Sequence, residues 1–546
     1  MAITGIRNFC YIPSVESTHD LFEYTSGRWI YNEEKRFEER RLGFDVPELK
    51  HVAARDINQE VSHVEGLHKL AEGGFNRIFE VRMKDGTSIL ARLPYPSTLP
   101  RRLAVASEVA TIEFVRAHGI PAPKILGYSL GENTVKSEYI LMEKLSGSTI
   151  GDSWFEISEQ QRLQVLHDIC DIEAKLCNIT LPASGSIYYA HDLPRDTPRV
   201  RISGLEGRFC VGPYAGLRWW HEDRARMNVD RGPHVESLSV MQAPAKKELD
   251  WIHHSGRTRF PFARQYREAF HYEKQDPKVH ADSLEKYLHV APYLVPARSD
   301  LNDPIIRHPD LQPNNIFISK DHKVTGLIGW QHAVVLPNFL AAGIPNSFQN
   351  YGDDESRSFT PPQLPSDLDP MNEGDRNRAQ EEFRRRQVHF FYLRFTQRLN
   401  DRHWRALESP GNILTRRIYD HASDPWEGLS TPLQFDLVQI ARSWGQIVTS
   451  DSNGSFPECA VSFSDEEMTR IDALDDAHRD SDTDIDQINE LLGVASDGWT
   501  PNERFEESKE RAVQIKEQGL AGADDDPWLR EMSERHWPWD DFDEDE

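Results

Sequence analysis

The stretch Ile305-Ile306-Arg307-His308-Pro309-Asp310-Leu311-Gln312-Pro313-Asn314-Asn315-Ile316-Phe317-Ile318-Ser319 decides the fold of this chain. It has the form H-x-D-L-x-x-x-N and runs into apolar residues typical of a strand. A loop of this form places the Asp310 carboxylate within hydrogen-bond reach of a hydroxyl group. At Asn315 the chain has entered the next strand, so the side-chain amide can face a bound phosphate from the side opposite Asp310. The alternative is an ordinary loop with a capping Asp and a buried Asn.

The residues after this loop predict a β-hairpin. Two apolar runs, 315–319 and 324–328, are joined by Lys320-Asp321-His322-Lys323. If the turn is tight, position 329 lies close to Asn315 across the ladder. Gly329 occupies that position and is followed by Trp330.

The motif resembles the catalytic loop of kinases and, more closely, that of the aminoglycoside phosphotransferase family. The resemblance implies that Asp310 is the catalytic base, that His308 braces the loop and that Asn315 binds a metal ion. It also implies ATP and Mg²⁺ as cofactors and a small-molecule hydroxyl as acceptor. That family carries a second metal-binding Asp in an I-D-W context. This chain has Ile328-Gly329-Trp330 instead, so the second carboxylate is missing.

Upstream of the loop, the pattern predicts a small lobe of strands and one helix. Residues 77–83 and 88–93 alternate as strands around an Asp85-Gly86 turn, which is a hairpin signal. A helix is expected over about 101–118 and a further strand within 137–145. With the catalytic loop, this order predicts an α+β, two-lobed protein-kinase-like fold with an antiparallel-sheet N-lobe and a mostly helical C-lobe.

The resemblance places nucleotide-binding residues on this small lobe. Arg92 stands where kinases have a strand lysine, and Glu108 on the following helix is its expected partner, because a carboxylate on a partly apolar flank needs a cation. The glycine-rich turn and the strand that leads to the second lobe complete the set: Gly73, Gly74, Phe75 and Asn76, then Met142 and Glu143. The alternatives are a plain turn, an exposed strand arginine and an ordinary core strand.

The chain is expected to have four regions. Residues 1–60 form an N-terminal extension, 61–145 the N-lobe, 146–500 the helical C-lobe with its catalytic loop at 305–330, and 501–546 an acidic tail. Helices in the C-lobe are expected at about 159–178, 245–254, 263–272 and 375–400.

Composition excludes several classes of protein. The formal net charge is −26, whereas a nucleic-acid binder needs a basic surface. No run of eighteen apolar residues is present, so membrane insertion is not expected. Five scattered cysteines without metal-ligand spacing indicate free thiols.

The acidity gathers at the end of the chain, where Asp540 to Glu546 is almost pure carboxylate. Such a run predicts a solvated, flexible extension, dispensable for folding from about Gly522. Three tryptophans in the same region (Trp528, Trp537 and Trp539) favour the alternative of a docking element for a protein partner.

More narrowly, the chain resembles the fungal "altered inheritance of mitochondria protein 9" group. The matching stretches are Tyr24 to Trp29, Leu70 to Phe75, Ser107 to Val115, Tyr139 to Lys144, Arg208 to Pro213, His308 to Phe317 and Trp330 to His332. The resemblance implies a mitochondrial location, with the cytoplasm as the alternative. The first fifteen residues contain Arg7 and no acidic residue, faintly like a transit peptide.

Three functions fit these observations. The first is an active ATP-dependent phosphotransferase, which the intact His308, Asp310 and Asn315 favour. The second is a pseudokinase that binds nucleotide or acts as a scaffold, which Gly329 favours. The third is an interaction protein that uses its acidic tail.

Overall fold

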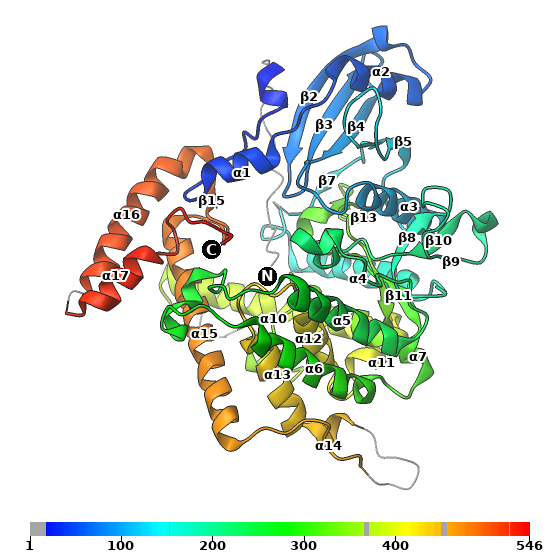
Figure 1. The fold of residues 1–546 in the computed structure, drawn as a ribbon. Helices are drawn as coiled ribbons and strands as arrows, with labels where there is room; N and C mark the ends of the chain where they lie inside the picture. The colour runs from blue at the N-terminus through cyan, green and yellow to red at the C-terminus, as the bar shows by residue number, and fades with distance from the viewer. Residues whose placement is uncertain (1–17, 152, 365–370, 449–455, 524) are drawn as a thin grey trace.

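The protein has a sheet-rich lobe and a larger helical lobe (Figure 1), which is the predicted fold class. A computed structural model describes residues 18–151, 153–364, 371–448, 456–523 and 525–546. The first fifteen residues, which faintly resemble a transit peptide, lie outside the described residues, as does the end of the Pro-rich stretch at 365–370. The boundaries of the four predicted regions stay predictions.

The N-lobe is a five-stranded antiparallel sheet in the order β2-β3-β4-β6-β5. Its strands are β2 (Val64–Glu72), β3 (Asn76–Met83), β4 (Ser88–Pro94), β5 (Ile125–Ser129) and β6 (Tyr139–Glu143).

Helices cover both faces of this sheet. Successive side chains of a strand point to opposite faces, and on β6 Leu141 packs in one core with α2 (Val46–Asp56) while Ile140 packs in another with α3 (Leu103–Ala117). The α3 helix therefore lies on the face opposite α2, where a residue such as Glu108 can meet β4.

A close crossing joins the two lobes. After β6 the chain turns at Gly147, with φ +98°, and a Cβ there would lie 2.2 Å from the Ile318 carbonyl oxygen. Glycine is therefore required by both its φ and the contact. The next residues form β7 (Ser148–Thr149), which pairs with the hairpin β12 (Ile316–Ile318) and β13 (Val324–Leu327). The chain that connects the two lobes therefore includes β7, which belongs to the same small sheet as the catalytic hairpin.

The rest of the molecule is mainly helical. Short strands flank the catalytic loop or link distant segments: β1 (Arg28–Trp29), β8 (Ser186–Tyr189), β9 (Val200–Arg201), β10 (Phe209–Gly212), β11 (Pro304–Ile306), β14 (Val335–Pro337) and β15 (Trp499–Thr500). The remaining helices are α1 (Glu33–Arg40), α4 (Glu159–Cys177), α5 (Ser237–Ser255), α6 (Pro277–Leu294), α7 (Ser299–Asn302), α8 (Asn338–Ala341), α9 (Asp354–Arg357), α10 (Glu373–Leu399), α11 (Asp401–Leu407), α12 (Asn412–Ser423), α13 (Thr431–Arg442), α14 (Trp444–Ile447), α15 (Asp465–Leu492), α16 (Phe505–Ala521) and α17 (Pro527–Arg535). Among the helices that the structure describes, none has the length and apolarity needed to cross a bilayer.

One predicted helix is wrong. The segment 263–272 forms two short 3-10 turns, Arg264–Tyr266 and Glu268–Phe270, and His271 and Tyr272 that follow have positive φ. Arg264 in this segment donates hydrogen bonds to the carbonyls of Arg535 and Asp540. The segment thus contacts a distant part of the chain, and helix propensity, which depends only on local sequence, does not predict its backbone conformation.

The prediction of a solvated tail is also wrong. Beyond Gly522 the chain forms α17 and then packs against the body. Trp539 is 7% exposed, and its indole N–H donates to Asn489 Oδ1 at 2.9 Å. Basic side chains from other elements, among them Lys35 and Arg36, pair with the terminal carboxylates. These cations counter the self-repulsion on which the prediction rested.

A buried ionic cluster fastens the N-terminal extension to the sheet beside the glycine turn. Glu72 at the end of β2 pairs with Arg77 Nε at 2.8 Å and with Lys69 Nζ at 3.1 Å. Its Oε2 also accepts hydrogen bonds from the backbone amides of Thr25 and Ser26 at 2.8 and 2.9 Å. The carboxylate is thus surrounded by donors from two separate segments.

We predict that Glu72→Gln destabilises the protein by roughly 3–5 kcal/mol, because removing one member of a buried ionic group leaves its partners unpaired. Denaturant unfolding measures the change. The matched control is Glu65→Gln, an exposed residue of the same strand, for which no comparable loss is expected. Equal stability of the two variants would contradict the structural role given to Glu72.

Candidate active site

The Asp310 carboxylate has one oxygen held and one open. Gln312 Nε2 and Asn315 Nδ2 donate to its Oδ2 at 2.6 and 3.0 Å, and Asn315 also donates to the Asp310 carbonyl at 2.7 Å. The residue is exposed, and its Oδ1 accepts no hydrogen bond from the described residues. This is the geometry of a fixed carboxylate that can accept a hydrogen bond from an incoming hydroxyl group.

His308 ties the loop to the hairpin, as predicted. Its Nδ1 accepts the Asp310 backbone N–H at 3.2 Å, so the ring proton sits on Nε2, which donates to the Ile328 carbonyl at 2.7 Å. Burial lowers the pKa of His308 to about 4, which keeps the ring neutral at neutral pH. Trp330 packs edge-on against the imidazole, with ring centroids 4.5 Å apart.

The strand before the loop is anchored separately by Arg307. Its guanidinium donates to Glu173 at 3.0 Å, to the Ala341 carbonyl at 2.9 Å and to the Tyr392 hydroxyl at 3.1 Å. These partners come from α4, α8 and α10, so three helices of the C-lobe fix the entry to the catalytic loop.

Gly329 lies beside Asn315, as the hairpin geometry predicts. Its φ is +86°, and a Cβ built there would lie 3.0–3.1 Å from the Asn315 amide atoms. A side chain at this position would therefore start next to Asn315, but glycine offers no ligand atom. Magnesium in nucleotide sites is usually held by one or two carboxylates. The residues present do not fit the two-ligand magnesium centre that the resemblance implies.

The glycine turn closes onto the residues that follow Trp330. Gly73 N–H donates to the Asn76 carbonyl at 2.9 Å, with Gly74 and Phe75 between them. Phe75 then meets His332 edge-on at 5.4 Å between ring centroids.

Gln331 connects the two lobes through its side-chain carbonyl. Its Oε1 accepts from Asn76 Nδ2 at 3.2 Å and from the Arg92 guanidinium. Gln331 and His332 are not among the site residues predicted from the sequence. Their position directly after Gly329 and Trp330 was the one feature of the sequence that could have indicated a place in the site.

The predicted ion pair between Arg92 and Glu108 is present, and both side chains are largely buried. Burial lowers the pKa of Arg92 to about 9, so the guanidinium still carries its charge at neutral pH. Arg92 thus places a fixed cation at the inter-lobe cleft.

Met142 and Glu143 lie within the sheet. Met142 packs against α3, and the Glu143 N–H donates to the Lys124 carbonyl at 3.0 Å. The Glu143 carboxylate accepts the Lys124 backbone N–H at 2.8 Å. The Glu143 amide is therefore already engaged, and a purine would have to bind another backbone group of this connection.

A small cavity lies beside the Arg92–Glu108 pair, between α3 and the sheet of the N-lobe. It measures about 10 Å³, which is at the lower limit for a single water molecule. Gln331 is the one residue of its lining that comes from beyond the N-lobe; the others are Asn76, Arg92, Pro94, Thr98, Pro100, Ala104, Val105, Glu108, Glu138 and Ile140.

Two other features of the molecule lie outside this site. His221, Glu222 and Glu427 bring three ligand atoms within 4.8 Å of one another. Burial acts to lower the pKa of His221, but hydrogen bonds with the two carboxylates raise it to about 9, so the cluster is an ion pair at neutral pH. Arg224 also lies 4.0 Å from Glu222. The two carboxylates of this cluster are therefore already paired with the cations His221 and Arg224.

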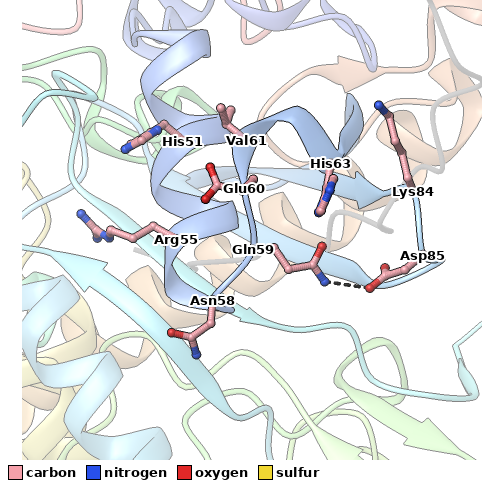
Figure 2. Close-up of a pocket in the computed structure, with 9 residues that line it drawn as sticks. All are labelled: His51, Arg55, Asn58, Gln59, Glu60, Val61, His63, Lys84 and Asp85. Atoms are coloured by element: carbon pink, nitrogen blue, oxygen red, sulfur yellow. Dashed lines mark hydrogen bonds between the residues drawn. The ribbon is translucent and has the colours of Figure 1, made fainter.

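A surface hollow of about 920 Å³ is lined by α2, the residues that follow it and the turn between β3 and β4 (Figure 2). The one hydrogen bond drawn among its lining residues joins Gln59 Nε2 to Asp85 Oδ2 at 2.7 Å. The lining residues are mostly exposed: His51, Arg55, Asn58, Gln59, Glu60, Val61, His63, Lys84 and Asp85. It lacks the buried, convergent polar groups of a built site.

Residues 66–337, which contain the glycine turn, Arg92 and the catalytic loop, match the phosphotransferase enzyme family. This part of the chain belongs to that family. A subtelomeric hrmA-associated cluster protein of Aspergillus fumigatus is 29% identical over 506 residues, covering 87% of this chain and 96% of the relative. Altered inheritance of mitochondria protein 9 of Saccharomyces cerevisiae, described as mitochondrial, is 22% identical over 572 residues, covering 89% and 87%.

Similar solved structures are also found. One is a ternary complex of streptomycin, ATP and the aminoglycoside phosphotransferase APH(2″)-IIa, with a TM-score of 0.36, 12% identity and coverage of 74% of this chain and 99% of that chain.

We predict that the free energy of unfolding depends on pH through His308. An unfolded histidine has a pKa near ~6.5, whereas that of His308 is about 4. The unfolded chain therefore binds more protons between these values, and stability falls as pH drops from about 6.5 to 4, by up to about 3 kcal/mol from this residue.

Denaturant unfolding at pH 7 and pH 5 checks this prediction. His308→Asn should lose less stability over this interval than the unsubstituted chain, because the titrating ring is gone. His253→Asn, which changes an exposed histidine of α5, is the matched control. The same loss in all three proteins would contradict the neutral, bridging state of His308.

Proposed function

We propose that this protein is an ATP-dependent phosphotransferase that acts on the hydroxyl group of a small molecule. The observation that carries the proposal is the Asp310 carboxylate, with Oδ2 fixed by Gln312 and Asn315 and Oδ1 open at the loop tip. The family of residues 66–337 supports the same reaction class.

In the proposed reaction, the acceptor hydroxyl donates a hydrogen bond to Asp310 Oδ1, which orients the oxygen toward the terminal phosphorus of ATP. A bond forms between that oxygen and the phosphorus, the bond from the phosphorus to the bridging oxygen breaks, and ADP leaves. The hydroxyl proton passes to Asp310. Arg92, held by Glu108, supplies positive charge to the phosphates once Gln331 has moved away. No step is assigned to a metal ion, because Gly329 leaves the usual ligand pair incomplete.

Asp310→Asn is predicted to lower phosphoryl transfer by about 100-fold or more, the usual contribution of a general base. Asparagine keeps an oxygen for Gln312 and Asn315, so the melting temperature and the affinity for ATP should stay close to those of the unsubstituted chain. ADP release with a panel of hydroxylated metabolites measures transfer, and calorimetry measures ATP binding. Asp321→Asn, in the exposed turn of the hairpin, is the control. Transfer that survives Asp310→Asn unchanged would overturn the assigned role.

The second candidate is a pseudokinase that binds nucleotide or serves as a scaffold, and the observation that favours it is Gly329. We predict that Gly329→Asp increases the Mg²⁺ dependence of ATP binding, because the new carboxylate starts beside Asn315. Gly329→Asn is the matched control, since it has the same shape and the same strain at φ +86° but no charge. Calorimetry with and without Mg²⁺, with melting temperatures alongside, compares the three proteins.

The outcomes separate the two candidates. The pseudokinase is supported if Gly329→Asp, but not Gly329→Asn, increases the Mg²⁺ dependence of ATP binding and the unsubstituted chain shows no phosphoryl transfer. Strong Mg²⁺ dependence in the unsubstituted chain would mean that another residue supplies the ligand, which removes the main support for the pseudokinase. If the unsubstituted chain binds no nucleotide under either condition, the phosphotransferase proposal fails.

We also extend to this protein the mitochondrial location in the name of the yeast relative, which is 22% identical to it. Microscopy of the tagged chain tests this, and a purely cytoplasmic signal would overturn it.

A further inference from the structure

The last eleven residues of the chain, 536–546, lie between the N-terminal extension and the helical lobe (Figure 1). We call them the C-terminal segment. One side of their binding surface is α1 with the preceding Asn32, and the other is the segment 257–274. Together these form what we call the basic groove.

The groove binds the main chain of the C-terminal segment through four basic side chains. Arg264 donates to the Asp540 carbonyl at 2.8 Å and Arg257 to the Asp545 carbonyl at 2.7 Å. Lys274 donates to the Glu546 carbonyl at 3.0 Å, and Arg259 approaches that of Glu544 at 3.4 Å. These contacts are repeated along the segment, as expected of a bound peptide and not of a loosely attached tail.

The arginines of the groove need these acceptors. Arg264 and Arg267 are 6% and 3% exposed, and burial lowers the pKa of each to about 10, which leaves both charged at neutral pH. A buried cation is costly unless it is paired and hydrogen-bonded. Arg267 donates to the Pro261 carbonyl of its own segment at 2.9 Å and to His536 Nδ1 at 2.8 Å, so the C-terminal segment supplies one of its polar partners.

The other side of the groove holds Phe542 and Glu544. Asn32 Nδ2 donates to the Phe542 carbonyl at 3.1 Å, and the Phe542 N–H donates to Asn32 Oδ1 at 2.9 Å. Glu544 pairs with Arg36 and, at 2.9 Å, with Lys35. Although burial works against it, these cations hold the pKa of Glu544 below its ordinary value.

Phe542 also contributes an aromatic anchor. Its ring lies 4.7 Å from the Arg264 guanidinium carbon, 5.9 Å from the Phe262 ring and 6.3 Å from the Tyr31 ring. A cation over an aromatic face and rings at these separations attract one another.

Contacts continue from α1 to the glycine turn. The carbonyl of Arg40, the last residue of α1, accepts from Arg77 Nη2 at 3.3 Å. Arg77 in turn pairs with Glu72, which directly precedes Gly73. A continuous set of packed groups thus joins the groove to the base of the turn.

We propose that the C-terminal segment is an intramolecular acidic ligand of the basic groove, and that its binding clamps the N-terminal extension, and with it the glycine turn, to the helical lobe. The proposal does not depend on whether the cleft binds ATP.

Hydrogen exchange of the full-length chain tests the proposal. Two variants release the segment in different ways: Phe542→Ala removes the aromatic anchor, and Asn32→Gly removes the reciprocal hydrogen bonds. Glycine accepts the φ of 48° at position 32, and the Asn32 side chain makes no capping hydrogen bond in α1. The control is Val513→Ala, on an exposed face of α16.

Both variants, but not the control, are expected to speed exchange at least tenfold in residues 536–546, in α1 and in residues 72–76. A synthetic peptide of residues 536–546 added to the Phe542→Ala protein should restore protection, and the same peptide with Ala at position 542 should not. Raising the salt concentration should weaken the peptide's affinity, because the partly exposed charges are screened.

Two results would overturn the proposal. If exchange in residues 536–546 is as slow in both variants as in the unsubstituted chain, the assigned contacts do not hold the segment. If the segment is released while α1 and residues 72–76 keep their protection, it is bound but clamps nothing.

Discussion

The hydrogen bonds of one neutral histidine organise the active site. His308 accepts from the loop at Asp310 and donates to the hairpin at Ile328, so the carboxylate and the strand that ends at Gly329 are set by the same ring. A charged imidazole could not accept the Asp310 N–H. Burial, which keeps the ring neutral, is therefore a condition for the loop geometry. From that hairpin the chain continues through Trp330 to Gln331, whose side chain accepts hydrogen bonds from Asn76 and Arg92 of the N-lobe. The position of the hairpin therefore also determines this contact between the lobes.

The large negative charge of the chain is not spread evenly over its structure. Buried carboxylates such as Glu72, Glu108 and Glu173 each meet an arginine from another element. A buried carboxylate is costly unless it is paired and hydrogen-bonded. Two of these carboxylates also join distant parts of the chain: Glu173 pairs with Arg307, 134 positions away, and Glu72 accepts hydrogen bonds from Thr25 and Ser26 of the N-terminal extension.

Local patterns predicted the elements that local forces determine. The strands around Asp85-Gly86, the helix that carries Glu108, and the hairpin that brings Gly329 next to Asn315 all follow from periodicity and turn residues. The Arg92–Glu108 pair was implied by the resemblance to kinases, and the partly apolar flank of Glu108 supported it because a carboxylate there needs a cation.

The contacts that were not predicted depend on distant partners. Gln331 meets Asn76 from 255 positions away, and no periodicity signals such a contact. The acidic end of the chain was misjudged for the same reason. Its own composition predicts repulsion, and only the folded arrangement of Lys35, Arg36 and the 257–274 segment supplies the opposite charge. The segment with the turns at Arg264 and Glu268 likewise has partners far along the chain, the carbonyls of Arg535 and Asp540, which its own sequence does not reveal.

The reciprocal hydrogen bonds between Asn32 and Phe542 have a consequence for folding. They join residues 510 positions apart, so they close one of the longest loops that the chain can make, and the entropy of closing such a loop favours making this contact after the lobes have formed. Because domains fold as they emerge during synthesis and the carboxyl end emerges last, the N-lobe and the catalytic hairpin can both be in place before this connection exists. We therefore expect the contact between Asn32 and Phe542 to form late in folding, after the N-lobe and the catalytic hairpin.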